Sequence, residues 1–316
     1  MSTTKTIPAK VARDRCTGSL IGLAVGNMLG IRFEGMPGRE VRRVWPGGPL
    51  EAPLREISMP WDDDTAMAME LAQHLVESAG DLQSEPLYDL YLAWSESNGR
   101  GIGIMTSEVL RTPRHESKMT PAERVWRLRG GSAGPTASNG AVMRVAPIGV
   151  RFRRDPARIL RNALADARLT HWEPLCGWSA AAVAVLVGDL IEERVTPLDE
   201  FLPAQGCPEG VMRGLLEEPP MDIETGGFDV DYIGYTLHAW KVALWASHVH
   251  GDFRECLQRV IRAGGDTDTN GAVAGAILGA RFGLAGIPPA WREPLHEQER
   301  ILQTGRRLHE LGLSES

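Results

Sequence analysis

Apolar residues recur along this chain mostly at intervals of three and four, the spacing that places them on one face of an α-helix. Residues 64–78 show it clearly, with Met67, Leu71 and Leu75 on one stripe. Alternating runs typical of β-strands are scarce, and residues 31–56, rich in Gly and Pro, are predicted to form a long irregular loop. The pattern predicts helices at residues 11–29, 64–78, 85–96, 104–110, 121–128, 156–167, 174–192, 231–249, 252–263 and 295–311, and others near residues 141 and 271–283.

Two of these predicted helices carry glycine at every fourth position. Because a glycine inside a helix costs roughly 1 kcal/mol relative to alanine, four on one stripe indicate that a neighbour packs very closely. We predict that the two helices pack against each other; the alternative is that each packs against a different helix. The glycines are Gly18, Gly22, Gly26 and Gly30 in the first helix, and Gly271, Gly275, Gly279 and Gly283 in the second.

The predicted elements indicate an all-α protein. A chain of 316 residues can bury a sizeable core. We expect residues 1–10 to be a flexible N-terminus and residues 11–316 to form a single compact domain of many helices.

Charge and cysteine content narrow the possible classes of protein. The formal charge is -7 and no basic block is present, so extended nucleic-acid binding is not expected. The four cysteines are scattered without a C-x-x-C pair, which is typical of reduced thiols. The N-terminus lacks an apolar signal core, and the longest apolar run, residues 180–187, is too short to cross a bilayer. We expect a cytoplasmic monomer that is not membrane-bound.

The candidate chemistry is concentrated in residues 264–271. Asp266 and Asp268 stand two residues apart, each followed by a threonine, between a glycine pair and a helix of small apolar residues. Such a segment can direct several oxygen atoms to one point, the ligand set that Mg²⁺ or Mn²⁺ prefers. The simpler alternative is a helix N-cap.

A second acidic cluster, Asp62, Asp63 and Asp64 before Thr65, also stands at the start of an apolar helix. Placed face to face, the two clusters would hold one or two cations, because crowded carboxylates repel one another unless a cation or solvent relieves them. Asp62 remains open between a metal ligand and a helix cap.

A small-residue loop at residues 130–140 precedes a predicted helix. Its backbone N–H groups are suited to an anion, although most such loops are simple connectors. Tyr232 is a candidate to stack on an adenine ring, whereas Trp240 and Trp245 are expected in the core.

These motifs resemble those of the ADP-ribosylglycohydrolase family. Four blocks match in the family's order and span residues 15–285. They are residues 22–30 followed by Glu34; Asp63-Asp64-Thr65; residues 139–144 continuing to Thr170-His171; and residues 265–269, preceded by Tyr232 and the helix at residues 237–245.

The resemblance implies an orthogonal multi-helix bundle with a central binuclear metal cleft. Two divalent cations, Mg²⁺ or Mn²⁺, would serve a hydrolase that removes ADP-ribose from a modified acceptor by cleaving the C1″ glycosidic bond. The implied metal ligands are Asp62, Asp63, Asp64, Asp266, Asp268 and Thr269. The implied catalytic residues are Glu34, Asp63, Asp64 and Asp268. The implied substrate-binding residues are Glu34, Gly101, Gly103, Ser138, Asn139, Gly140, Ala141, His171 and Tyr232.

This assignment fits the chemistry of the residues. A pair of cations can grip the two ribose hydroxyls and orient a water. Carboxylates stabilise the oxocarbenium character that develops at C1″. Glu34, on a loop that could close, is a candidate general acid/base. His171 matches a ribose-side histidine, but a satisfied core histidine has the same sequence appearance.

Three positions depart from the family's pattern. Asn27 replaces a common Asp, Asp62 replaces a Ser or Thr, and Gly101 stands where arginine-directed members have Asp. The last departure weighs against an arginine-linked substrate and favours a serine-linked, nucleic-acid-linked or small-molecule ADP-ribosyl compound.

Two other function classes remain as alternatives. One is an inactive ADP-ribose-binding or immunity-type protein, and the other is a two-metal phosphoesterase, which would release phosphate. Apart from Asp62, which departs from the family's pattern, all five implied metal ligands match the motifs, and this favours the enzyme.

Overall fold

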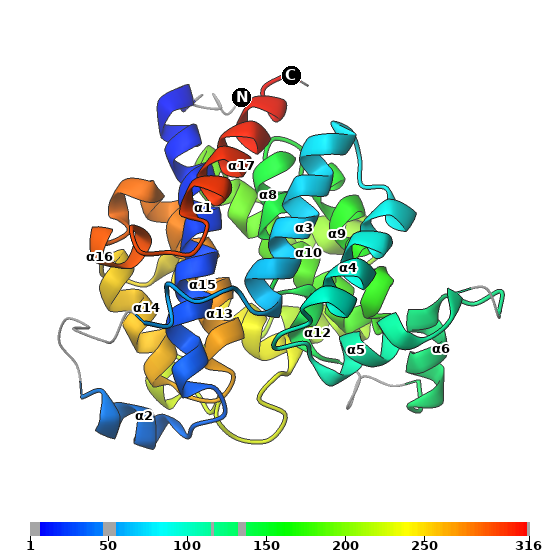
Figure 1. Ribbon diagram of the computed structural model, residues 1–316, viewed down its shortest axis with the longest axis horizontal. Helices are drawn as coiled ribbons and strands as arrows, with labels where there is room; N and C mark the ends of the chain where they lie inside the picture. The colour runs from blue at the N-terminus through cyan, green and yellow to red at the C-terminus, as the bar shows by residue number, and fades with distance from the viewer. Residues whose placement is uncertain (1–6, 47–54, 115–116, 132–136, 315–316) are drawn as a thin grey trace.

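The computed structural model describes residues 7–46, 55–114, 117–131 and 137–314, and its regular elements are all helices (Figure 1). These described residues form no strand, only the isolated bridges Pro37–Gly264 and Ser138–Tyr235. The all-α prediction is therefore confirmed. The longer helices are α1 (Ala9–Gly30), α3 (Asp63–Ser78), α4 (Ser84–Ser97), α5 (Ile104–Arg111), α6 (Pro121–Leu128), α9 (Pro156–Thr170), α10 (Pro174–Glu192), α13 (Thr236–His248), α14 (Phe253–Arg262), α15 (Thr267–Gly286) and α17 (Gln298–Leu311).

The two glycine-striped helices, α1 and α15, pack against each other at the centre of the molecule. A Cβ at Gly22 would overlap the backbone carbonyl of Gly275, and a Cβ at Gly26 would overlap that of Gly271. Only glycine allows two backbones to approach this closely. The predicted pairing is confirmed, and it places the end of α1 beside the start of α15, where Thr267 Oγ1 donates to Gly30 O at 2.8 Å.

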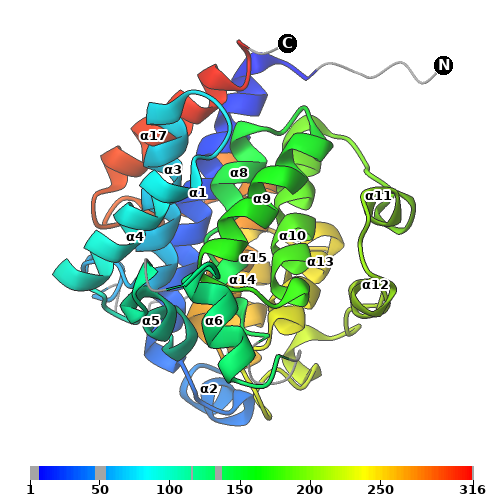
Figure 2. The same ribbon diagram turned by 90° about the vertical axis from the view of Figure 1, so that its right-hand side faces the viewer.

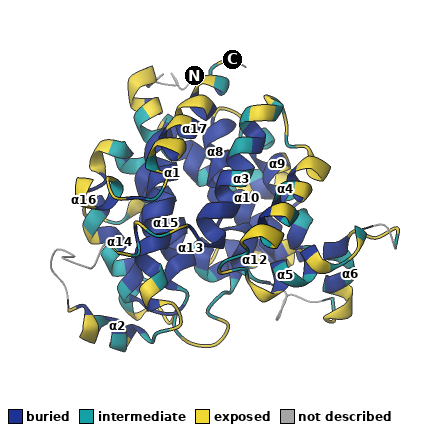
Figure 3. Ribbon diagram, viewed as in Figure 1, coloured by how far each residue is buried: buried dark blue, intermediate teal, exposed yellow. Residues whose placement is uncertain are grey.

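Other helices surround this pair. α10 packs against α9, α13 and α15, while α17 lies along α1 and α3. Burial is concentrated on α1, α10, α13 and α15, and the outer turns are exposed (Figure 3). Trp240 and Trp245 are buried as expected, and all four cysteines are buried and free. Figure 2 shows α11 (Leu198–Ala204) and α12 (Glu209–Leu215) at the periphery.

Two helical segments are long and apolar enough to cross a membrane, Ala9–Phe33 and Pro174–Glu192. Most of each lies inside the fold, 89% and 83% buried respectively, as in core helices of a folded domain. The second contains the apolar run at residues 180–187 and has the bounds predicted from the sequence, residues 174–192.

Several element boundaries differ from the sequence-based predictions. The helix predicted from residue 231 begins at Thr236, because Asp231 and Tyr232 adopt positive φ angles of 29° and 31° that a helix cannot contain. The helix predicted from residue 295 begins at Gln298. The helix predicted from residue 11 begins at Ala9, and residues 1–6 of the expected flexible terminus lie outside the described residues.

Short helices were missed. The predicted loop at residues 31–56 contains η1 (Ile31–Phe33) and α2 (Gly38–Val44), while its residues 47–54 lie outside the described part. Near residue 141 the structure has η3 (Asn139–Ala141) followed by α8 (Ala146–Arg151). The other missed helices are α11, α12, α16 (Pro289–Arg292) and η4 (Ile223–Thr225).

Candidate active site

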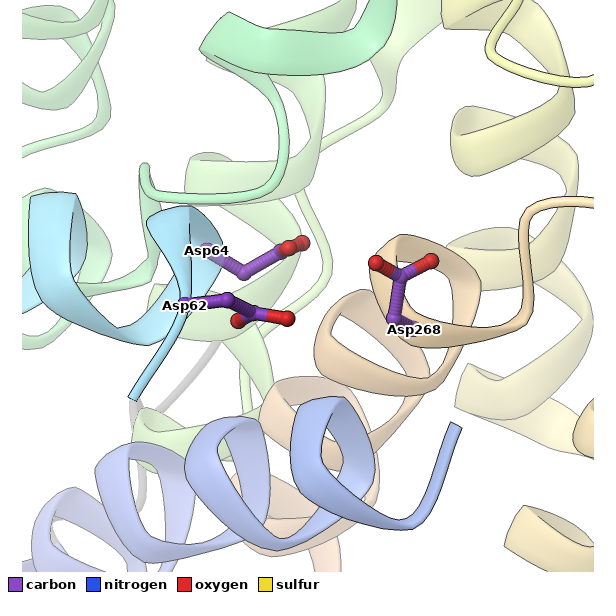
Figure 4. A group of neighbouring side chains, drawn as sticks. All are labelled: Asp62, Asp64 and Asp268. Atoms are coloured by element: carbon purple, nitrogen blue, oxygen red, sulfur yellow. The ribbon is translucent and has the colours of Figure 1, made fainter. Parts of the chain in front are cut away.

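The two acidic clusters meet at the ends of α3 and α15 (Figure 4). One carboxylate oxygen from each of Asp62, Asp64 and Asp268 lies within 4.8 Å of the other two, and all three residues are buried. The clusters therefore face each other as predicted. The last turn of α1 contacts both segments, because Gly30 O accepts from Thr267 at the start of α15 and Asn27 Nδ2 donates to Asp64 at the start of α3.

Neither cluster acts as a helix cap. Asp62 and Asp266 occupy the N-cap positions of α3 and α15, yet neither side chain accepts a capping hydrogen bond. Within the described residues, the Oδ1 atoms of Asp62, Asp64 and Asp268 have no hydrogen-bond partner. Capping is therefore the wrong explanation, since buried oxygens without donors need another positive partner.

The pKa values of these carboxyl groups also indicate that the cluster needs a positive partner. Burial raises the pKa of Asp62 to about 6, with Asn27 and Arg100 opposing the shift. Burial raises the pKa values of Asp63, Asp64 and Asp268 well above the ordinary value for aspartate, and repulsion from the neighbouring carboxylates raises them further. A hard divalent cation would replace these protons, and the all-oxygen donor set fits such an ion.

The remaining predicted ligands lie beside the three clustered carboxylates. Asp63 Oδ2 accepts from Gly103 N at 3.3 Å, and Asp266 Oδ2 accepts from Asn139 Nδ2 at 2.9 Å. Thr269 lines the cleft, and its side chain opposes the rise in the pKa of Asp64. All six predicted ligands therefore gather in one region, four of them lining an adjoining cleft.

That cleft has a volume of about 410 Å³. Ala141 is fully buried and Tyr232 is 69% exposed, so both predicted substrate residues stand outside the cleft lining. The predicted residues that line it are Glu34, Asp63, Gly101, Gly103, Ser138, Asn139, Gly140, His171, Asp266, Asp268 and Thr269.

His171 is both a satisfied core histidine and a cleft residue. Its Nε2 lies 2.9 Å from Ser138 Oγ and its Nδ1 lies 2.8 Å from Thr170 Oγ1. Burial, and secondarily the Arg144 guanidinium, lower the pKa of His171 to about 3. The imidazole is therefore neutral at physiological pH and holds the Ser138 hydroxyl by a hydrogen bond without adding charge.

Glu34 stands in the short connection between η1 and α2. The next residue, Gly35, donates its N–H to Gly265 O at 2.8 Å, and Gly265 N donates to Met36 O at 2.9 Å. The segment bearing Glu34 is thus fixed to the turn bearing Asp266. Partial burial, and then the Asp266 charge, raise the pKa of Glu34, which suits a proton-transfer group.

The sequence reasoning missed several cleft residues. Ile104 and Ile233 directly follow the predicted residues Gly103 and Tyr232, and Met105, Thr106 and Gly234 lie within three residues of them, so closeness in sequence was the available signal. Arg129 gave no signal of its own beyond standing just before the small-residue loop. The missed lining residues are Ile104, Met105, Thr106, Arg129, Met143, Ile233 and Gly234.

Comparison with known proteins identifies the family. The family profile for ADP-ribosylglycohydrolase matches residues 8–315, nearly the whole chain. The chain belongs to the ADP-ribosylglycohydrolase family. Membership agrees with the all-α fold and with the acidic cluster described above.

Several proteins similar to this chain have informative names. An ADP-ribosyl-[dinitrogen reductase] glycohydrolase from Rhodospirillum rubrum is 29% identical, covering 89% of this chain and 90% of the relative. The ADP-ribosylarginine hydrolase Tri1 of Serratia proteamaculans is 27% identical, covering 96% of this chain and 81% of the relative. A solved ADP-ribosylglycohydrolase-related protein complex is similar with a TM-score of 0.66 and 27% identity, covering 96% of this chain and 99% of that one. These findings support ADP-ribosyl hydrolysis.

Proposed function

We propose that this chain is a metal-dependent hydrolase that releases ADP-ribose from a modified acceptor by cleaving the glycosidic bond at C1″. The observation that carries the proposal is the meeting of Asp62, Asp64 and Asp268, whose buried oxygens lie within 4.8 Å of one another beside a cleft. Family membership supports the reaction class.

The all-oxygen donor set suits hard divalent cations, and we propose two ions of Mg²⁺ or Mn²⁺. The residues that would hold them are Asp62, Asp63, Asp64, Asp266, Asp268 and Thr269. When bound, such cations supply Lewis-acid stabilisation of ribose oxygens and lower the pKa of a bound water.

The chain's own residues supply binding and proton transfer. Glu34, with its raised pKa, would exchange a proton with the leaving group or the attacking water. Ser138, Asn139 and Gly140 lie in the cleft wall and would contact the pyrophosphate. Neutral His171 keeps Ser138 in place, so the anionic substrate meets a fixed hydroxyl there.

The acceptor linkage is indicated by Gly101. Its φ is 77°, and a Cβ there would lie 2.7 Å from Asp63 Oδ1 and 2.9 Å from Asp62 Cβ. The site therefore has no space for an acidic side chain at residue 101. Because no acid can pair with a guanidinium there, the site favours an acceptor other than arginine. The name of the relative from S. proteamaculans, an ADP-ribosylarginine hydrolase, favours an arginine-linked substrate instead.

A panel of arginine-, serine- and nucleobase-linked ADP-ribosyl conjugates tests the reaction and the linkage together. The expected product is free ADP-ribose, formed with Mg²⁺ or Mn²⁺ and measured by chromatography. Release of inorganic phosphate instead would indicate a phosphoesterase. ADP-ribose binding without release from any conjugate would indicate a binding protein.

A further inference from the structure

Asn27 belongs to the last turn of α1, lies beside the acidic cluster and has no exposed surface. Its Oδ1 accepts a hydrogen bond from Thr65 Oγ1 at 2.6 Å, and its Nδ2 donates to Asp64 Oδ2 at 3.3 Å. A carboxylate oxygen of Asp62 lies within 4.8 Å of one of Asp64, and Asn27 opposes the rise that burial causes in the pKa of Asp62. One neutral side chain thus donates to one of the three carboxylates that meet at the site and favours the ionised form of a second.

The orientation of this amide is determined by its partners. Thr65 occupies the acceptor oxygen, so the NH₂ group faces the carboxylates. The reverse orientation would set the amide oxygen against Asp64 Oδ2, an acceptor against an acceptor. Asn27 is therefore a fixed, uncharged donor inside a region that already contains three unpartnered carboxylate oxygens.

We propose that Asn27 is the positioning residue that allows Asp62 to stand beside Asp63 and Asp64, its neutral donor offsetting the carboxylate that Asp62 adds. The proposal rests on the proposed function, since it takes the acidic cluster as a cation site.

The two positions should then be energetically coupled. An Asp at residue 27 removes the donor to Asp64 and adds a carboxylate at that position, where repulsion in a buried site is large. Replacing Asp62 with Thr removes one negative charge from the same group. The second change should relieve the first, because residues that share partners do not act additively.

The test is a double-mutant cycle of Asn27→Asp, Asp62→Thr and the double variant. Thermal unfolding midpoints are measured in chelator, and Mn²⁺ affinity is measured by calorimetry. Asn27→Asp is expected to lower the midpoint by several degrees, and the double variant to recover at least half of that loss. Asp62→Thr alone is expected to bind Mn²⁺ roughly tenfold more weakly than the unmodified chain.

Asn162→Asp is the matched control. Asn162 is also buried, and its amide also donates to a carboxylate, that of Asp81, but it lies outside the acidic cluster. Its loss of stability should be unaffected by Asp62→Thr. If Asn27→Asp fails to fold alone, folding of the double variant supports the proposal.

Three results would overturn the proposal: additive changes across the cycle, a double variant that does not fold although Asp62→Thr does, and unchanged Mn²⁺ affinity in Asp62→Thr. Failure of the unmodified chain to bind any Mn²⁺ would instead refute the metal-dependent function. The unfolding arm in chelator uses no metal, so these two failures are distinguishable.

Discussion

Asn139 Nδ2 donates a hydrogen bond to Asp266 Oδ2 at 2.9 Å and so joins two segments that are 127 residues apart. One segment forms the cleft wall that is proposed to contact the pyrophosphate, and the other begins the acidic turn before α15. The hydrogen bond sets the position of this cleft wall relative to the candidate cation site.

Replacing Asn139 with Ala should therefore weaken ADP-ribose binding by roughly tenfold, about the loss of one hydrogen bond to a charged group. Calorimetry with ADP-ribose measures the change. Asn98→Ala, at an exposed position outside the cleft lining, is the control and should bind normally. Equal affinities for both variants would show that Asn139 does not organise the site.

Gly101 and Gly103 offer a matched pair within the cleft. A Cβ at Gly101 would press on Asp63 Oδ1 at 2.7 Å, and the residue has φ of 77°, whereas a Cβ at Gly103 would meet nothing within 4 Å. Gly101→Ala should reduce ADP-ribose release by at least about tenfold, because the new methyl group would displace the Asp63 carboxylate. Gly103→Ala should have little effect. Similar rates for the two variants would contradict the steric argument.

The packing of α1 on α15 makes a prediction about stability. Gly22→Ala should lower the free energy of unfolding by about 1–3 kcal/mol, because the new methyl group would overlap the Gly275 carbonyl. Urea denaturation measures this change. Gly210→Ala in α12 is the control, since a Cβ there meets nothing within 4 Å, and it should be neutral or stabilising by up to about 1 kcal/mol.

The low pKa of His171 predicts that the protein loses stability as the pH falls. Its pKa is about 3 in the folded protein against an ordinary 6.5, so below pH 6.5 the unfolded chain binds a proton that the native state excludes. The stability that this difference confers is fully present above pH 6.5 and is lost as the pH falls toward 3, at up to roughly 1.4 kcal/mol per pH unit.

Unfolding free energies of the unmodified chain and His171→Gln, measured between pH 4.5 and 7.5, test this prediction. The His171→Gln variant should lose less stability on acidification, because glutamine does not titrate. Parallel pH profiles for the two proteins would mean that His171 is not buried in its neutral form.

The sequence predicted the fold where local signals were strong. The glycine stripes correctly paired α1 with α15, and that pairing correctly placed the end of α1 beside the acidic turn before α15. Short helices such as α2 and α12 were missed, because few residues give too little periodicity and their stability comes from packing. The start of α13 was wrong because Asp231 and Tyr232 have positive φ angles, which the hydrophobic pattern does not report. Arg129 reaches the cleft only through the folded arrangement of α5 and α6, which no local pattern reports.

The most direct test of metal-dependent hydrolysis uses one reactive conjugate. Its rate of ADP-ribose release is compared with saturating Mn²⁺ and with chelator, for the unmodified chain and for Asp268→Asn. Asp199→Asn, an exposed substitution in α11, serves as the control.

We predict that chelator reduces release to background, that added Mn²⁺ restores it, and that Asp268→Asn lowers the rate by at least about 100-fold. The Asp199→Asn control should keep the full rate. Release that persists in chelator, or an Asp268→Asn variant with the rate of the unmodified chain, would contradict the assignment of Asp62, Asp64 and Asp268 as the catalytic cation site.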